Sequence, residues 1–192
     1  MRVGVMGGTF DPIHLGHLRA AENAREALRL ERVVFVPVGA PPHRSLPLSS
    51  AFDRFAMACL ATADNPAFGV SDLEVSRPGP SYTVDTLERL AAELDGAELF
   101  LIVGSDAYAE METWKDLQRL LSLCRVAVVE RPAENGNARR STALGAEVEA
   151  VRGPGLAISA STIRHRVAAG HSIRYLVTDG VAAHVAKRGL YR

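Results

Sequence analysis

The chain has 192 residues, of which 47% are hydrophobic and 23% are charged. This composition is too apolar for a disordered protein, and the length fits a single domain. Lysine and arginine together number 22, as do aspartate and glutamate, so the net charge gives no reason to expect a nucleic acid or a membrane as partner. An anionic ligand would have to be held by a local cluster of residues.

No apolar run in the sequence approaches the roughly 20 residues that cross a bilayer, and the first residues do not resemble a signal peptide. The two cysteines, Cys59 and Cys124, lie in apolar surroundings. This predicts reduced structural thiols rather than a disulfide or a nucleophile. We therefore expect a cytoplasmic protein.

Short segments rich in Val, Ile and Phe alternate along the chain with segments of helical period. The predicted strands are residues 2–6, 32–38, 67–75, 99–103, 125–130 and 146–151. Predicted helices begin near His14, span 49–64, carry Leu87 and Leu90, and close the chain at about 160–169 and 179–188. Strands that alternate with helices predict an α/β fold, a Rossmann-like doubly wound parallel sheet with helices on both faces.

We expect one domain over residues 1–192, with a core to about 158 and a small helical part over about 159–192. The polar segment 131–145 is predicted to be a surface loop. In folds of this kind, ligands bind beyond the carboxyl ends of the strands.

The first candidate site is the stretch "GVMGGTFDPIHLGHL", residues 4–18. Gly7 and Gly8 follow the first predicted strand and allow a sharp turn and a close approach of a ligand to the backbone. His14 and His17 project from the same side of a helix start, which favours phosphate, and Gly16 leaves the space between them open. A zinc pair or two surface histidines are the alternatives, but zinc needs further ligands, and no Cys or His cluster of suitable spacing occurs elsewhere in the sequence.

The segment "GGTFDPIHLGH" resembles the HxGH signature of the nucleotidyltransferase superfamily, and in this extended form it is similar to the bacterial nicotinate-mononucleotide adenylyltransferases. The resemblance runs along almost the whole chain. It implies that ATP is bound by the glycines already named and by Thr9 and Phe10.

A second candidate segment is "ISASTIR", residues 158–164. Ser159 is suited to cap the following helix together with the hydroxyls of Ser161 and Thr162, and Arg164 carries a fork that grips phosphate. An ordinary capped helix with a solvated arginine would explain this pattern equally well. The resemblance implies instead that the segment, from Ile158 onwards, binds the ATP phosphates.

A third segment, "APPHRS" at 40–45, carries Arg44 where the family usually has lysine. The charge is kept, but the forked guanidinium is not equivalent to an ammonium. A solvated loop arginine is the alternative.

The remaining candidates lie in "SYTVDTL", "GSD" and "TW". We expect Ser81 or Thr83 to cap a helix, and Trp114 either to pack in the core or to stack on a pyridine ring. The resemblance implies an ATP-side turn containing Gly104 and Asp106. It also implies a mononucleotide subsite made of Tyr82, Thr83, Val84, Asp85 and Trp114. We expect the two aspartates to face hydroxyls or to cap backbone groups.

Taken together, the resemblance implies adenylyl transfer from ATP to nicotinate mononucleotide, giving deamido-NAD and pyrophosphate. His14, His17, Arg44 and Arg164 would then be the catalytic residues, with Mg²⁺ carried mainly by the ATP phosphates and no metal site on the protein. The rival hypotheses are a sister enzyme that uses nicotinamide mononucleotide or phosphopantetheine, and a non-catalytic nucleotide-binding protein. The family also makes a homodimer plausible.

Overall fold

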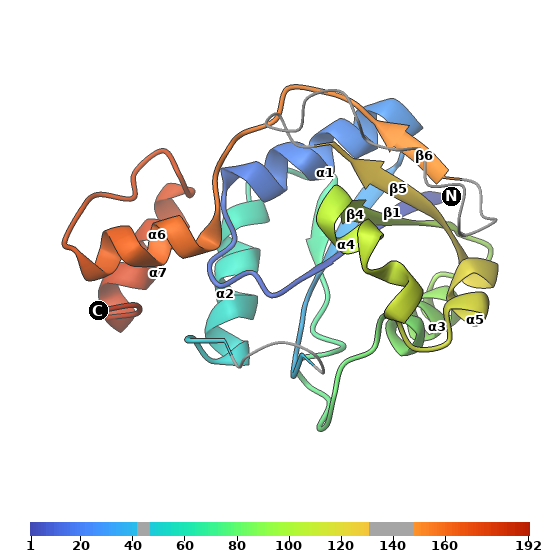
Figure 1. The fold of residues 1–192 in the computed structure, drawn as a ribbon, viewed down its shortest axis with the longest axis horizontal. Helices are drawn as coiled ribbons and strands as arrows, with labels where there is room; N and C mark the ends of the chain where they lie inside the picture. The colour runs from blue at the N-terminus through green and yellow to red at the C-terminus, as the bar shows by residue number, and fades with distance from the viewer. Residues whose placement is uncertain (42–46, 131–147) are drawn as a thin grey trace.

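The computed structural model describes residues 1–41, 47–130 and 148–192. Within these residues, six strands form one sheet in the order β3-β2-β1-β4-β5-β6, and every neighbouring pair is parallel (Figure 1). The strands are β1 (Arg2–Gly8), β2 (Arg32–Pro37), β3 (Phe68–Val70), β4 (Glu98–Gly104), β5 (Cys124–Val129) and β6 (Val148–Val151). The predicted α/β class with a parallel sheet is confirmed.

Helices connect the strands and close the chain. They are α1 (Leu15–Leu28), α2 (Ala51–Thr62), α3 (Thr83–Glu93), α4 (Ser105–Ala109), the 3₁₀ turn η1 (Met111–Thr113), α5 (Leu117–Leu123), α6 (Ala160–Ala168) and α7 (Asp179–Arg188). The described helices offer no segment with the length and apolar character of a membrane span.

The strand predicted over 67–75 is much shorter in the structure. β3 is an edge strand that pairs with β2 only from Val33↔Phe68 to Phe35↔Val70. Beyond it, the Ser76 N–H donates to the Asp72 carbonyl (2.9 Å) and closes a turn, so the alternation of polar and apolar residues there belongs to a loop. The predicted loop 131–145 lies outside the described residues.

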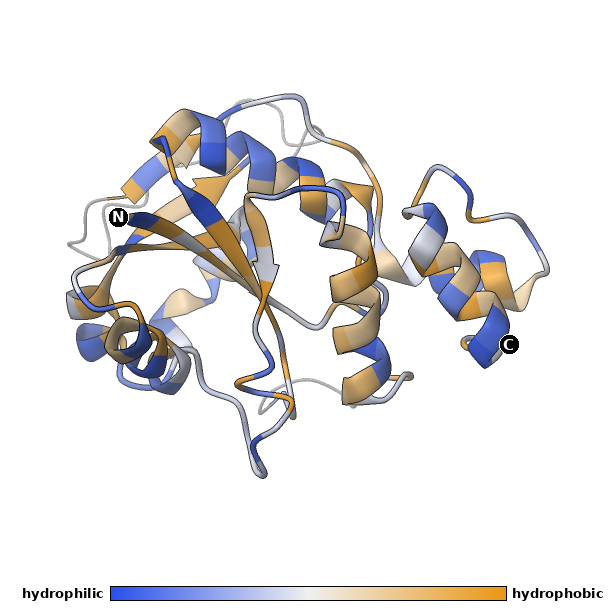
Figure 2. Cartoon of the chain, turned by 180° about the vertical axis from the view of Figure 1, so that it is seen from behind, coloured by the Kyte–Doolittle hydropathy of each residue, from blue (hydrophilic) through white to orange (hydrophobic). Residues whose placement is uncertain are grey.

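Two apolar clusters lie on opposite faces of the sheet, as the alternation along β4 shows. Leu99 and Leu101 pack in one cluster, with residues of α3 and α5. Phe100 and Ile102 pack in the other, with residues of α1 and α2. Side chains alternate between the faces of a strand, so helices cover both sides, and Figure 2 shows the largely hydrophobic strands between them.

The helices α6 and α7 lie beside α2 at one end of the molecule (Figure 1). Their buried residues Ile163, Val181 and Val185 belong to the same cluster as Met57 of α2. The division of the domain near residue 158 stays a prediction.

The cysteines are free thiols in the structure. Burial raises the pKa of Cys124 to about 11, and burial also raises the pKa of Cys59. Because the thiolate is the reactive form, both thiols are poor nucleophiles at neutral pH, as expected for structural cysteines.

An ion-pair cluster fastens α7 to α2. Asp53 of α2 is buried, and it bonds His184 Nε2 and Arg188 Nε, each at 3.0 Å. Burial alone would raise the pKa of Asp53, but the hydrogen bonds from Ser50, Arg188 and His184 together lower it.

The lowered pKa of Asp53 predicts that the free energy of unfolding depends on pH. A carboxylate whose pKa is lower in the folded chain stabilises the fold above the unfolded pKa, near 4, and loses this effect as pH falls through the folded pKa. We expect Asp53→Asn to cost about 2 kcal/mol of unfolding free energy at pH 7. In urea titrations between pH 7 and 3 the difference from wild type should shrink below about pH 4. Asp64→Asn, at an exposed position just after α2, is the control; a deficit of Asp53→Asn that is constant with pH would contradict the linkage.

Candidate active site

The strand order reverses between β1 and β4, which are the first and the fourth strand of the chain. Their ladder runs only from Arg2↔Glu98 to Val5↔Leu101, although β1 continues to Gly8 and β4 to Gly104. Two strands that stop pairing before they end separate at their carboxyl ends, and such a switch point is where ligands bind in open α/β sheets. The predicted site residues of both strands lie at this edge.

The two histidines of the front motif lie against one another. Their rings stack with centroids 3.7 Å apart and an angle of 22° between the planes, which confirms that they project to the same side. His14 is not in the first turn as predicted; its extended backbone makes it the N-cap of α1. His14 is buried and His17 half-buried.

A hydrogen bond sets the protonation pattern of His17. Its Nδ1 accepts the backbone N–H of His14 at 3.2 Å, so in the neutral ring the proton is on Nε2. The ring also meets Phe10 edge to face, with centroids 5.1 Å apart. His17 is therefore oriented by the hydrogen bond at Nδ1 and by contacts with the rings of Phe10 and His14.

The four glycines predicted at the site have different surroundings. A Cβ on Gly7 or Gly104 would meet nothing within 4 Å. A Cβ on Gly8 would lie 2.7 Å from the Phe10 ring, and one on Gly16 would lie 3.0 Å from Nδ1 of His14. Gly8 and Gly16 thus make room for side chains of the motif itself, and the role of the four glycines in binding a ligand stays a prediction.

The N-terminus of α1 is less open than the sequence suggested. The N–H of Leu15 donates to the carbonyl of Leu176 at 3.0 Å, so the first helical N–H is bonded to the connection between α6 and α7. The side chains of His14 and His17 lie beside this helix start.

Asp11 is a buried residue whose carboxylate accepts several hydrogen bonds, and it was not among the predicted site residues. Its carboxylate accepts hydrogen bonds from the backbone N–H groups of Leu48 (2.9 Å) and Ser49 (3.3 Å), from the Ser49 hydroxyl and from the Tyr191 hydroxyl (2.8 Å). Burial raises the pKa of Tyr191, which keeps the phenol protonated as the donor. The signal available in the sequence was that Asp11 is the one acidic residue of the motif at 4–18.

The second motif lies directly beside the first. Ser159 caps α6 by accepting the Thr162 N–H at 3.1 Å, as predicted, and its hydroxyl also lies 3.0 Å from that of Ser161. Arg164 donates from Nη1 to the backbone carbonyl of Asp11 at 2.8 Å. Two motifs 153 residues apart in sequence therefore meet at one edge of the sheet; Ile158, at the start of the second motif, is half-buried.

The start of α3 differs in detail from the prediction. Its N-cap is Tyr82, whose side chain makes no capping bond, and Thr83 is the first helical residue. Ser81 does not cap the helix; its hydroxyl accepts the N–H groups of Gly39 (3.2 Å) and Ala40 (3.4 Å). The expectation that Ser81 or Thr83 caps α3 was wrong, because the loop after β2 needs this hydroxyl.

Lys115 contacts two of the residues predicted for the mononucleotide subsite. Its Nζ donates to both carboxylate oxygens of Asp85, at 2.9 and 3.1 Å, and lies 4.6 Å from the ring centroid of Tyr82. Asp85 therefore pairs with a cation instead of facing a hydroxyl or capping the backbone, which corrects the prediction. Trp114, next to Lys115 in the chain, is half-buried against the same apolar cluster as Tyr82 and the buried Val84.

Two predicted site residues, Asp106 and Arg44, remain to be placed. Asp106 is exposed in the first turn of α4, just beyond β4. Arg44 lies outside the described residues.

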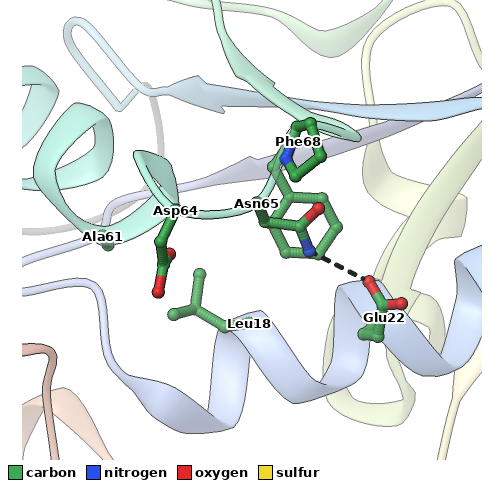
Figure 3. Close-up of a pocket in the computed structure, with 7 residues that line it drawn as sticks. Leu18, Glu22, Ala61, Asp64, Asn65 and Phe68 are labelled. Atoms are coloured by element: carbon green, nitrogen blue, oxygen red, sulfur yellow. Dashed lines mark hydrogen bonds between the residues drawn. The ribbon is translucent and has the colours of Figure 1, made fainter.

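A pocket elsewhere, between α1, α2 and β3, is unsuited to a phosphate. It is lined by Leu18, Glu22, Ala61, Asp64, Asn65, Pro66 and Phe68 (Figure 3). The hydrogen bond from Arg25 lowers the pKa of Glu22, and Asp64 adds a second carboxylate. A triphosphate would be repelled here, so the carboxyl ends of β1 and β4, where the two strands stop pairing, are the better candidate.

Comparison with known proteins gave matches over nearly the whole chain. The family model described as cytidylyltransferase-like matches residues 5–166. A protein of Thermus thermophilus named "Probable nicotinate-nucleotide adenylyltransferase" is 45% identical, with all of both chains covered. A protein of the same name from Corynebacterium kroppenstedtii is 46% identical over 99% of this chain and 90% of its own length.

Solved structures match the fold. The nicotinic acid mononucleotide adenylyltransferase of Plasmodium falciparum complexed with NaAD superposes with a TM-score of 0.80, at 18% identity, over 99% of this chain and 97% of its own. The same enzyme complexed with APC gives a TM-score of 0.78 over 99% and 96% of the two chains.

Proposed function

The chain belongs to the cytidylyltransferase-like family, and from this membership, its full-length relatives and the geometry of the site we propose that it is a nicotinate-nucleotide adenylyltransferase. It transfers the adenylyl group of ATP to nicotinate mononucleotide and forms deamido-NAD and pyrophosphate, a step of NAD biosynthesis. The observation that carries the proposal is the contact of Arg164 with Asp11, because it joins the two phosphate-binding motifs at the switch point.

The reaction is a phosphoryl-type substitution. The phosphate of nicotinate mononucleotide attacks the α-phosphorus of ATP in line, a new P–O bond forms, and the bond to the bridging oxygen of pyrophosphate breaks. A phosphate monoester is ionised at pH 7, so the chain needs no general base. Its residues act by positioning the reactants and by stabilising the charge that develops on the phosphates.

The two histidines suit the α-phosphate. Because Nδ1 of His17 accepts the His14 N–H, the neutral ring carries its proton on Nε2, which would donate to the phosphate; preorganised donors stabilise an anion without reorganisation. Arg164, already oriented by the Asp11 carbonyl, would clamp the leaving pyrophosphate together with Arg44. The Ser159, Ser161 and Thr162 hydroxyls at the start of α6 would complete the triphosphate side.

The donors of the front motif fit phosphate better than a resident metal. Mg²⁺ prefers oxygen ligands, and the carboxylate of Asp11 already accepts bonds from Leu48, Ser49 and Tyr191. We therefore propose that Mg²⁺ enters with ATP, where it neutralises phosphate charge.

The pyridine side has donors suited to a carboxylate. The N-terminus of α3 favours an anion, the N-cap side chain leaves the first N–H groups to a ligand, and Lys115 adds a cation beside Tyr82. Trp114 would stack on the ring. An amide in place of the carboxylate would direct its own NH₂ donors at these donors.

This arrangement predicts a strong preference for the acid. With ATP and Mg²⁺, release of pyrophosphate should be efficient with nicotinate mononucleotide, at least about 10²-fold weaker in kcat/KM with the nicotinamide form, and absent with phosphopantetheine. Comparable efficiency with the two mononucleotides would refute the pyridine subsite, and activity with phosphopantetheine alone would refute the proposed function.

The histidines predict a loss of turnover with little loss of fold. His14→Ala and His17→Ala should each lower kcat by about 10²–10³-fold. His17→Asn is the matched variant, because its side-chain oxygen can still accept the His14 N–H; it should keep the melting temperature of wild type but not the turnover. Turnover close to wild type in His17→Asn would show that the residue serves only as a cap.

We further propose that two copies associate through the exposed face of α2. The charged residues of this helix, Asp53 and Arg54, are both buried, whereas Phe52 is 73% and Leu60 42% exposed. Phe55, Ala56 and Cys59 lie half-buried between them, and Figure 2 shows α2 hydrophobic along most of its length. On α2 the charged side chains are buried and apolar side chains are exposed, which is the reverse of an ordinary surface helix.

The spacing of the α2 face suits a second copy of the chain. Phe52 and Leu60 lie four residues to either side of the small Ala56, so a two-fold axis near Ala56 would place each Phe52 against Leu60 of the other copy. The exposed Phe52 and Leu60 would form the apolar centre of an interface that buries about 800 Å² per partner.

Light scattering coupled to gel filtration tests this association. Wild type should run as a dimer, and Phe52→Glu or Leu60→Glu as a folded monomer. Tyr175→Ser removes an 84% exposed side chain from the connection before α7 and should leave the dimer intact. A monomeric wild type at micromolar concentration would contradict the proposal.

A further inference from the structure

The buried face of α2 carries a cation where an apolar residue is expected. Arg54 is 1% exposed and stands three and four residues before Met57 and Ala58, which are fully buried. Residues at this spacing share one face of a helix, so the guanidinium points into the protein with the apolar stripe. Burial lowers the pKa of Arg54, as expected for a cation removed from water.

The guanidinium joins the ends of two neighbouring strands. Nη1 donates to the carbonyl of Thr9 at 2.9 Å, and Nη2 donates to the carbonyl of Gly39 at 3.1 Å. Thr9 follows β1 and Gly39 lies just after β2, and these strands are adjacent in the sheet. One rigid fork thus holds the two loops that leave the sheet at its ligand-binding edge.

Gly39 is also held from the other side. Its N–H donates to the hydroxyl of Ser81 at 3.2 Å, and a Cβ at this position would lie 2.1 Å from the carbonyl oxygen of Glu74. The loop after β2 is therefore fixed between the start of α3, on the mononucleotide side, and α2. Thr9, the other acceptor, directly precedes Phe10, whose ring packs against His17.

A gain in the free energy of unfolding does not account for a buried guanidinium at position 54. A well-packed apolar side chain often stabilises a buried position as much as a charged group does, and the acceptors here are neutral carbonyls. The carboxylates of Asp11 and Glu74 act on Arg54 only through longer-range attraction. A role in the geometry of the site accounts for the cation.

We propose that Arg54 is a positioning residue for adenylyl transfer, which sets the distance between the loop after β1 and the loop after β2 so that the two substrates meet in line. The inference rests on the function proposed above. Arg54 itself touches no reacting atom in this proposal; it acts through Thr9 and Gly39. Misplacement of reacting groups by about 1 Å can cost on the order of 10²-fold in rate.

The variants Arg54→Lys and Arg54→Met separate geometry from charge. Lysine keeps the positive charge but, as a single point donor, cannot bridge two carbonyls as a fork does; methionine fills the volume without charge. Both should lower kcat by about 10–10²-fold, with KM for either substrate changed less than kcat. Arg188→Met is the control, because it removes a guanidinium that also contacts α2, through Asp53, but reaches neither loop; its kcat should equal that of wild type.

Hydrogen exchange supplies a readout independent of activity. In both Arg54 variants, amides of residues 8–11 and 38–40 should exchange faster than in wild type, while those of β4 should not change. Should Arg54→Met fail to fold, Arg54→Lys carries the test by itself. Full turnover in Arg54→Lys, or unchanged exchange in both loops, would overturn the inference. A wild type that makes no deamido-NAD would refute the proposed function, yet the exchange result would still decide whether Arg54 fixes the loops.

Discussion

The site depends on a buried carboxylate. Asp11 is 4% exposed, and a carboxylate removed from water must be surrounded by donors. The chain supplies them from Leu48 and Ser49 before α2 and from Tyr191 at the end of the chain. The requirement of one side chain thus brings three distant segments to the same point, and the backbone carbonyl of Asp11 then orients Arg164.

The two histidines are held in a related way. Their stacking leaves no room for a side chain at position 16, and the bond from the His14 backbone defines which nitrogen of His17 carries the proton. Small residues and a helix cap therefore do what a metal does in other sites: they fix the orientation of imidazoles before the ligand arrives. Preorganisation of this kind is what an anion-stabilising site requires.

Contacts with neighbouring elements also determine which side chains of α2 are buried. Asp53 faces α7 and Arg54 faces the strand ends, so the polar groups of the helix are turned inward. Apolar residues are left on its outer face. The buried contacts of Asp53 and Arg54 explain this distribution, and the apolar outer face is the surface that we propose for association with a second copy.

The sequence by itself determined the alternation of strands and helices and the positions of the two motifs, whose resemblance to a known family implied the class of reaction. The alternation follows from apolar periods, and the motifs are short local patterns: glycines after a strand, and histidines at i and i+3. Only the tertiary structure decided which groups are joined. The hydroxyl of Ser81 is taken by Gly39 and Ala40, Asp85 is taken by Lys115, and Gly8 accommodates Phe10. In each case the two residues are distant in sequence or are brought together by a turn of the backbone. Hydrogen bonds and close packing depend on distances between atoms in space, which a local sequence pattern does not contain.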